Sequence, residues 1–149
     1  MAGNTTMSDT LPLAAKGCHA PPPVLSGPQQ AVSVAVQCWP GVIAATHWHL
    51  NRPEEVNGAD FYVGDQELGH IHLDGEVHLA TSPALRELLI TRGLARPFPY
   101  YRAWIETSIR SEAEANHAEW LFKLNYDRLQ GTSFDSLSAS IRLYATQSR

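Results

Sequence analysis

The sequence predicts an α+β fold, with helices packed on one face of a mostly antiparallel sheet. Two dipeptides, Gly64-Asp65 and Asp74-Gly75, separate short segments with strand character, and such dipeptides are typical of two-residue β-hairpin loops. Helix-capping residues occur before and after this region, so helices and strands are segregated along the chain, as in α+β proteins. The length of 149 residues corresponds to a single domain.

The first element expected is a helix that begins near Pro28 and ends at about Cys38. Proline is favoured in the first turn of a helix, and apolar residues recur at helical spacing through this stretch. The same stretch also alternates at Val32, Val34 and Val36, so a strand is the alternative. The sequence Trp39-Pro40-Gly41 ends the element in either case.

Four strands are expected next, and together they form a β-meander. A polar loop over residues 51–60 separates the first strand from the other three. The expected strands are 42–49, 60–63, 66–73 and 76–80.

Two helices and one further strand complete the expected order α-β-β-β-β-α-β-α. Ser82-Pro83 begins a helix that ends at Gly93, and residues 100–109 then form a strand. A capping box at Ser111 and Glu114 begins a longer helix that ends near residue 129. The apolar stripe of this helix consists of Ala118, Leu121, Phe122 and Tyr126.

The chain is expected to have three parts. Residues 1–25 are rich in proline and are expected to form a flexible leader, because they carry too little apolar surface to offset the entropy cost of ordering. Residues 26–130 form the α+β domain. In residues 131–149, apolar residues recur at near-helical spacing, which is compatible with a short docking helix.

Composition excludes several classes of partner. The chain has 11 Lys and Arg residues against 15 Asp and Glu residues, which argues against a nucleic-acid partner. It has no apolar run long enough to span a membrane, and its start lacks the features of a secretory signal, so we expect a cytoplasmic protein without a membrane partner. Cys18 and Cys38 are too few for a disulfide framework, and we expect both as free thiols.

Histidine placement is the most informative feature of the sequence. Five of the seven histidines lie between residues 47 and 78, and four of them form the motifs His47-Trp48-His49 and His70-Ile71-His72 on expected strands. Residues two apart on a strand share a face, so each motif presents two imidazoles on the same side. Such imidazoles can transfer protons or bind Zn, Fe, Cu or Ni.

The expected strand register assigns these histidines to faces of the sheet. If each turn dipeptide forms a two-residue loop, His70 pairs with Leu79 and His72 with Val77. This register places both histidines on the apolar, core-facing side and His78 on the opposite side, although a bulge at Gly69 would change the assignment. Burial would lower the pKa of both imidazoles and favour a neutral base or ligand.

These observations predict a histidine-lined pocket that binds a small molecule. His70 and His72 are the expected acid–base pair or, in the alternative, metal ligands, and the other three histidines are expected to assist them catalytically: His47, His49 and His78. No cofactor is favoured, because no complete metal-binding motif is present, and a divalent Zn, Fe, Cu or Ni ion is the alternative. The residues expected to bind substrate are Tyr62, Tyr101, Arg102 and Trp104.

Several motifs of the chain resemble a known family. They are Phe61-Tyr62-Val63-Gly64, Glu67-Leu68-Gly69-His70-Ile71-His72, Ser82-Pro83-Ala84-Leu85-Arg86 and His117-Ala118-Glu119-Trp120-Leu121-Phe122. Over about residues 30–130, the chain resembles the luciferase domain family, a group of small bacterial and fungal proteins. The resemblance implies a single α+β domain.

Two functions from different classes remain open at this point. The first is a small-molecule enzyme of biosynthesis, either a cofactor-free isomerase, cyclase or lyase acting on a secondary metabolite or a metal-dependent oxidative enzyme. The second is a non-catalytic domain that binds a small ligand or another molecule and has structural histidines. Histidines that converge on an open cavity would favour the enzyme, whereas histidines that are each buried against a backbone carbonyl with no adjoining cavity would favour the second function.

Overall fold

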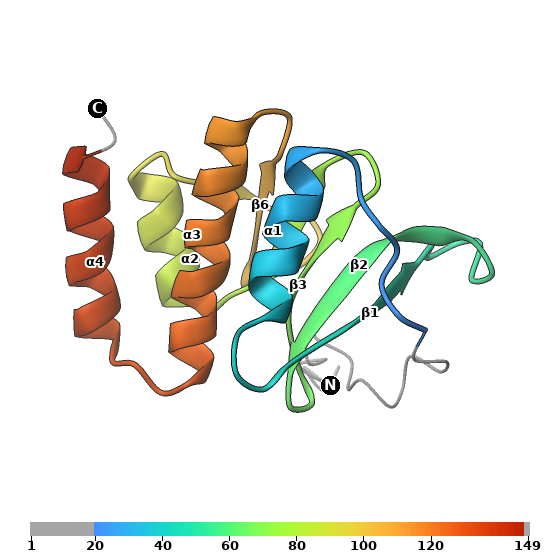
Figure 1. The fold of residues 1–149 in the computed structure, drawn as a ribbon. Helices are drawn as coiled ribbons and strands as arrows, with labels where there is room; N and C mark the ends of the chain where they lie inside the picture. The colour runs from blue at the N-terminus through green and yellow to red at the C-terminus, as the bar shows by residue number, and fades with distance from the viewer. Residues whose placement is uncertain (1–19, 148–149) are drawn as a thin grey trace.

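A computed structural model describes residues 20–147 as a six-stranded antiparallel sheet with helices on one face (Figure 1). The sheet order is β1-β2-β3-β4-β6-β5, and the expected α+β class and element order are confirmed. The two-residue strand β5 and the last helix add to that order. The elements are α1 (Pro28–Gln37), β1 (Val42–Trp48), β2 (Val56–Val63), β3 (Gln66–His72), β4 (Glu76–Ala80), α2 (Pro83–Thr91), β5 (Arg96–Pro97), β6 (Trp104–Ser108), α3 (Glu112–Leu129) and α4 (Phe134–Gln147).

The first element is a helix, so the strand alternative for this stretch is wrong. Pro28 lies in the first turn of α1, and the N-cap is Gly27, which makes no side-chain capping bond. The helix buries Val32, Ser33 and Val36. Of the three alternating valines, Val32 and Val36 are buried and Val34 is half exposed.

The helices α2 and α3 begin where their capping residues predict. The Ser82 hydroxyl accepts a hydrogen bond from the Leu85 amide at the start of α2. At the start of α3, the Ser111 hydroxyl accepts from the Glu114 amide at 3.1 Å, and the Glu114 carboxylate accepts from the Arg110 amide at 3.1 Å. The expected apolar stripe of α3 is buried in full.

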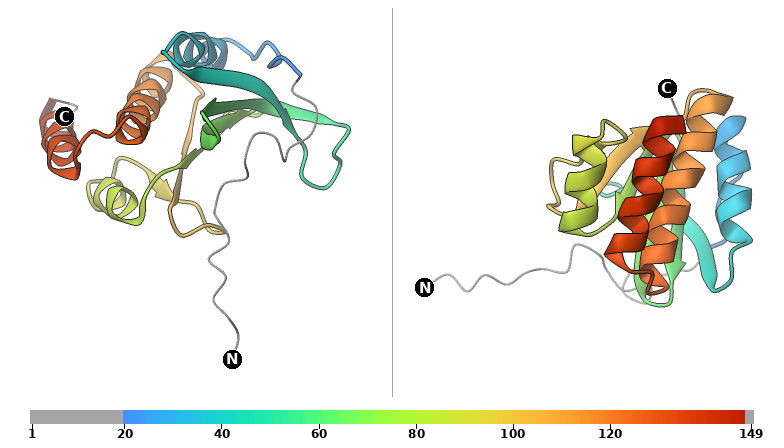
Figure 2. Two further views of the ribbon diagram at one scale, coloured as in Figure 1. Left: turned by 90° about the horizontal axis from the view of Figure 1, so that it is seen from below. Right: turned by 90° about the vertical axis from the view of Figure 1, so that its left-hand side faces the viewer.

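The hydrophobic core lies between the sheet and the helices, which gather on one side of the sheet (Figure 2). Phe61 of β2 contacts Phe122 of α3 edge to face, with ring centroids 5.6 Å apart. Asn125 of α3 is fully buried, and its side-chain amide donates to the carbonyls of Leu68 and Ala80. These two hydrogen bonds join α3 to β3 and β4, so polar contacts as well as apolar packing hold this helix on the sheet.

The hairpin between β3 and β4 differs from its predicted register. His70 pairs with His78 and Ile71 with Val77, because the loop holds the three residues 73–75 rather than two. Gly75 adopts a φ of 92°, a left-handed conformation that suits glycine and is typical of three-residue hairpin loops. The one-residue difference moves every side chain of one strand to the other face, so His78 shares a face with His70 and His72.

A bulge in β3 produces the second departure from the predicted register. Val63 pairs with Gln66 across a two-residue loop, as expected, but Phe61 pairs with Gly69 rather than with its predicted partner Leu68. The extra residue places Glu67 and His70 on the same face. A Cβ atom at Gly69 would lie 2.6 Å from the His78 carbonyl oxygen, so glycine is required where β3 and β4 approach here.

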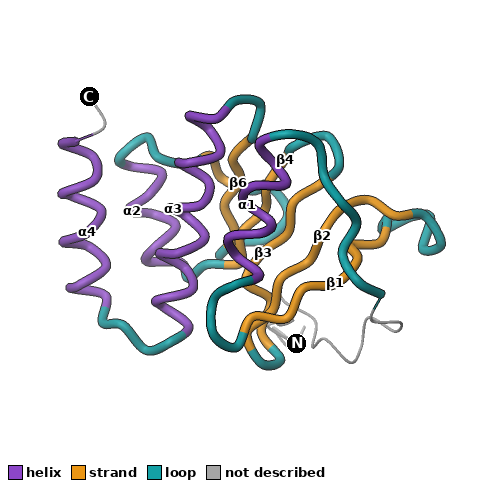
Figure 3. The backbone as a smooth tube through the Cα atoms, in the orientation of Figure 1, coloured by secondary structure: helices purple, strands orange, loops and turns teal. Residues whose placement is uncertain are grey.

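The strand boundaries also correct the expected loop before β2. This strand, β2 (Figure 3), begins at Val56 rather than Asp60. Asp60 therefore lies in the middle of a buried strand rather than at the boundary between a loop and a strand. In the other direction, β6 is shorter than the expected strand 100–109 and begins only at Trp104.

The two ends of the described chain pack against the domain. Leu25 is buried, and residues 20–21 lie beside β1, where Thr46 donates from its amide to the Ala20 carbonyl and from its hydroxyl to the Pro21 carbonyl. At the other end, α4 packs on α2 and α3, with the Tyr144 ring stacked 3.7 Å from that of Trp120.

Two sequence-based expectations fall partly outside the structure. Residues 1–19, which make up most of the expected leader and include Cys18, lie outside the described residues. Cys38 is exposed and carries a free thiol. Between residues 20 and 147, every helix is too short or too polar to cross a membrane.

Candidate active site on the helix-free face

Four histidines meet on the face of the sheet that is turned away from the helices, here called the helix-free face. His47 lies on β1, His70 and His72 lie on β3, and His78 lies on β4. Their ring centroids are 4.1 to 5.0 Å apart in the five pairs that are in contact. The sheet register explains the meeting, because Asp60, His70, His78 and Glu106 form one row across β2, β3, β4 and β6.

Each histidine of this cluster has one ring nitrogen directed at a polar side chain at the edge of the cluster. Nδ1 of His47 lies 2.6 Å from the Asp60 carboxylate, and Nδ1 of His70 lies 2.9 Å from the Glu67 carboxylate. Asp60 and Glu67 are both buried. The remaining two contacts are Asn57 Nδ2 to His72 Nδ1 at 2.9 Å and His78 Nε2 to Glu106 Oε2 at 3.5 Å.

The other ring nitrogens of His70, His72 and His78 face a neighbouring imidazole. Nδ1 of His78 lies 3.0 Å from Nε2 of His70 and 3.1 Å from Nε2 of His72. The ring of His47 stacks on that of His70, with centroids 4.1 Å apart and an interplanar angle of 11°. By contrast, His117 on α3 binds the Leu94 carbonyl and the Tyr144 hydroxyl, which is the arrangement expected of a structural histidine.

Burial lowers the pKa of three cluster histidines. The pKa of His70 lies well below its ordinary value of 6.5, mainly because the buried ring cannot be solvated when charged and then because His47 lies beside it. The same causes lower the pKa of His72. Burial and the neighbouring His72 lower the pKa of His78 to about 4. These three imidazoles are therefore neutral at pH 7.

Aromatic side chains border the cluster on the side of β6. The Phe98 ring lies 4.3 Å from that of His78, and the Trp104 ring lies 5.8 Å from that of His70. Tyr101 contacts Trp104 at 5.0 Å and is partly exposed. The indole nitrogen of Trp104 is buried, and no hydrogen-bond partner for it is present among residues 20–147. The structure thus places Trp104 and Tyr101 beside the cluster.

Tyr62 is also on the helix-free face, but it lies beneath the cluster. The side chain is fully buried, and its hydroxyl donates to Oδ2 of Asp60 at 3.3 Å. Burial and the carboxylates of Glu67 and Asp60 raise its pKa above the ordinary value of a tyrosine, so the hydroxyl stays protonated. In this position Tyr62 orients Asp60.

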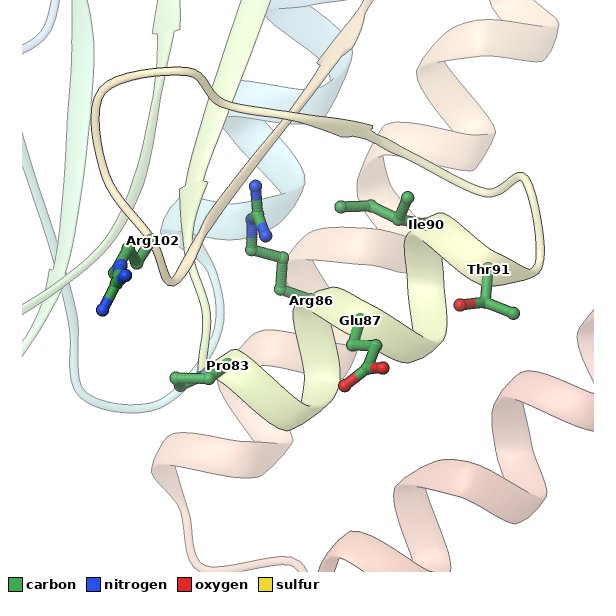
Figure 4. A pocket seen from close by; sticks show the side chains of 6 residues that line it. All are labelled: Pro83, Arg86, Glu87, Ile90, Thr91 and Arg102. Atoms are coloured by element: carbon green, nitrogen blue, oxygen red, sulfur yellow. The ribbon is translucent and has the colours of Figure 1, made fainter.

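Two other residues of the predicted site lie away from the cluster. His49 follows the end of β1, and its Nδ1 accepts a hydrogen bond from the Asn51 amide, so it stabilises the loop before β2. Arg102 lines a different, open cavity of about 450 Å³. Figure 4 shows this cavity between the loop before β6 and the α2 residues Pro83, Arg86, Glu87, Ile90 and Thr91.

A smaller cavity of about 210 Å³ lies next to the cluster rather than over it. Glu67 and Trp104, which contact His70 on either side, contribute to its lining. Arg128 and Thr81 add polar groups.

Among residues 20–147, two sets of side chains lie close enough together to hold a metal ion. Ring nitrogens of His47, His70 and His72 lie within 4.8 Å of one another. A second set consists of Asp60, Glu67 and His70. Imidazole sets suit Zn, Cu, Ni and Fe, whereas carboxylates suit harder cations.

The sequence did not identify the residues that orient the imidazoles. Asp60, Asn57 and Glu67 are not among the predicted site residues, because Asn57 was assigned to a loop, Asp60 to the boundary between that loop and a strand, and the position of Glu67 depends on the β3 bulge. The available signal was a carboxylate in an otherwise apolar strand, Asp60-Phe61-Tyr62-Val63. A buried carboxylate requires a partner, and histidine is the titratable residue that recurs in the adjacent strands.

The fold and the cluster define a class of protein, namely a small α+β protein with a histidine site on the helix-free face of an antiparallel sheet. Residues 65–125 match the family described as Luciferase domain, which confirms the resemblance indicated by the sequence motifs. The matched segment runs from β3 into α3 and contains His70, His72 and His78, while His47 precedes it. No curated protein and no solved structure matches the chain.

Proposed function

We propose that the protein is a small-molecule enzyme in which the histidine cluster performs acid–base chemistry of the isomerase, cyclase or lyase type. The observation that carries this proposal is the continuous row Glu67, His70, His78 and Glu106, in which carboxylates lie at both ends of two contacting imidazoles. Such a row can accept a proton at one end and delocalise the resulting charge.

The contacts assign a role to each member of the row. The Glu67 carboxylate accepts the Nδ1 proton of His70, which leaves Nε2 of His70 to accept a hydrogen bond from Nδ1 of His78. Nε2 of His78 then carries a lone pair, 3.5 Å from the Glu106 carboxylate. We assign His78 Nε2 as the base, because a proton that arrives there forms an imidazolium that Glu106 stabilises.

The reaction that fits this base is the removal of a proton from carbon beside a carbonyl group. The substrate C–H bond breaks, its electron pair forms an enolate, and the proton moves to Nε2 of His78. Return of the proton to a different atom gives an isomer, while loss of a leaving group from the enolate gives a lyase product. A neutral imidazole at pH 7 is the protonation state that this step needs.

Two features favour an aromatic or conjugated substrate, such as a secondary metabolite. Phe98 and Tyr101 provide apolar ring surface next to His78. The indole N–H of Trp104, which has no hydrogen-bond partner within residues 20–147, is a donor beside His70, and a buried donor without a partner is uncommon in proteins. A small local movement would allow it to donate to the enolate oxygen.

A non-catalytic ligand-binding domain is the second candidate function. It is favoured by the burial of His70 and the partial burial of the other three rings, and by the two described cavities, neither of which is lined by a cluster histidine. Against it, the cluster rings contact one another and polar side chains, unlike His117, which binds a backbone carbonyl.

Deuterium incorporation tests the proposed enzyme. The full chain is incubated in D2O with a panel of 1,3-dicarbonyl compounds and aryl ketones, and loss of the C–H signal is followed by proton NMR. We expect catalysed exchange with at least one compound, and a loss of about 100-fold or more in His78→Gln. The matched control is His117→Gln, which removes a histidine on the helix side. Exchange that is absent throughout, or equal in wild type and His78→Gln, would favour the ligand-binding domain.

A further inference from the structure

The four cluster histidines have a second feature in common, which is the direction of their nitrogens. Each ring has one nitrogen at a side chain that lies outside the cluster, and in His70, His72 and His78 the other nitrogen faces a neighbouring imidazole. The outer partners are Asp60 for His47, Glu67 for His70, Asn57 for His72 and Glu106 for His78.

This orientation is the one that metal-binding histidines have in proteins. A ligating imidazole usually donates its second N–H to a carboxylate or carbonyl oxygen, which fixes the tautomer and leaves the other nitrogen free for the metal. Asp60 and Glu67 do this for Nδ1 of His47 and His70, at 2.6 and 2.9 Å. The Asn57 amide lies 2.9 Å from Nδ1 of His72, and a half-turn of this amide presents its oxygen to the ring.

We propose that the cluster is a binding site for one divalent transition-metal ion, held by the inward-facing nitrogens of His47, His70 and His72. Ring nitrogens of these three residues lie within 4.8 Å of one another. Around a tetrahedral ion with bonds of about 2.0–2.1 Å, ligand nitrogens lie about 3.4 Å apart. The most widely spaced pair therefore needs to approach by up to about 1.4 Å. The His47 ring, which stacks on that of His70 at an interplanar angle of 11°, also needs to rotate so that its Nε2 faces the ion.

His78 provides the fourth position of this site. Its Nδ1 lies 3.0 Å from Nε2 of His70 and 3.1 Å from Nε2 of His72, which is close to the spacing of adjacent ligands on one ion. As a fourth ligand through Nδ1, His78 would carry its proton on Nε2 and could not act as the base. If a substrate oxygen displaced it, the ion would supply Lewis-acid stabilisation of the enolate and His78 would be released for the role of base.

The chemistry of the ligands defines the class of ion. Imidazole nitrogens suit Zn, Cu, Ni, Co and Fe, whereas Ca and Mg prefer oxygen ligands. The buried carboxylates of Asp60 and Glu67 bring negative charge next to the proposed ion. The alternative set of Asp60, Glu67 and His70 uses these carboxylates as ligands, but both already orient imidazoles, so we assign them as outer partners.

The inference rests on the proposed function only for the location of the reaction, and metal binding can be measured without substrate. Co(II) is the probe, because nitrogen coordination with four ligands gives visible absorption far stronger than that of the hydrated ion. The tag-free full chain is treated with a chelator, dialysed and titrated with Co(II). We expect one equivalent to bind, with an intense visible spectrum that Zn(II) abolishes by displacement.

Three variants identify the site, each checked for wild-type circular dichroism. His72→Gln removes a ligand at the more exposed end of the cluster and should abolish the intense spectrum. Glu67→Gln keeps the ligands but weakens the outer partner of His70, and should lower Co(II) affinity by 10- to 100-fold. The matched control, His117→Gln, should keep the wild-type titration.

Two results would overturn the inference. One is the absence of an intense Co(II) spectrum in the wild-type chain, and the other is an unchanged titration in folded His72→Gln. These outcomes are separate from the deuterium-exchange test. If chelator-treated protein catalyses exchange but binds no Co(II), the proposed function holds without a metal, whereas stoichiometric binding without exchange supports the metal site alone.

Discussion

Acidification should destabilise the metal-free protein, and His78 should be responsible for a measurable part of the loss. The pKa of His78 is about 4 in the folded protein and 6.5 for the ordinary group. Between these values the unfolded chain binds a proton that the folded chain does not. Because the folded pKa is the lower one, the stabilising contribution is present above about pH 6.5 and is lost as the pH falls toward 4.

The size of the effect follows from the two pKa values. For a single group with these values, the free energy of unfolding falls by about 2 kcal/mol between pH 7 and pH 4.5. The side chain of His78 is only 15% exposed, so solvent screening reduces this figure little. His70 and His72 have lowered pKa values too, and the total loss in the wild-type protein should therefore exceed the contribution of His78.

Urea denaturation at a series of pH values, in the presence of a chelator, measures the effect. We expect the wild-type protein to lose about 2 kcal/mol more than His78→Gln between pH 7 and pH 4.5. His117→Gln serves as the control for loss of a histidine as such. Parallel pH profiles for wild type and His78→Gln would refute the assignment of a strongly lowered pKa to His78. The proposal that neutral His78 acts as the base would then fail as well.

Three substitutions test other parts of the structure. Gly69→Ala places a Cβ 2.6 Å from the His78 carbonyl oxygen and should cost about 2 kcal/mol in urea denaturation; an unchanged midpoint would show that β3 and β4 can separate there. Asn125→Leu removes the donor to the Leu68 carbonyl and should cost about 2–3 kcal/mol by the same assay, a prediction contradicted by a neutral effect. Trp104→Phe removes the indole N–H, which has no partner in the described part of the chain, and should slow deuterium exchange by about tenfold, with only a small stability loss; an equal exchange rate would exclude Trp104 as the donor.

Local sequence signals were sufficient for most of the fold. Ser82 and Ser111 cap the helices that they predict, and Gly64-Asp65 forms the predicted two-residue loop. In these cases the determining interaction lies within a few residues of the signal. The choice between helix and strand for α1 depended instead on packing against α3 and the sheet, which the alternating valines do not reveal.

The arrangement of the site was harder to predict, because it depends on register. Asp74-Gly75 indicates a tight turn equally well with a loop of two or three residues, yet only the three-residue loop brings His78 to the face of His70 and His72. Glu67 joins the same face through the bulge next to Gly69. The sequence therefore identified the imidazoles but assigned His70 and His72 to the core-facing side of the sheet, whereas both lie on the helix-free face. It did not identify the carboxylates.

The segment beside β1 has a consequence for how the protein behaves at high concentration. β1 is a border strand of the sheet, and unpaired border strands promote intermolecular β-pairing and aggregation. Here the carbonyls of Ala20 and Pro21 occupy donors of Thr46. The three prolines at positions 21–23 have no amide hydrogen, so the covering segment cannot itself recruit a further strand. We therefore expect the tri-proline segment to limit intermolecular pairing at β1 and so to lower the tendency of the protein to aggregate.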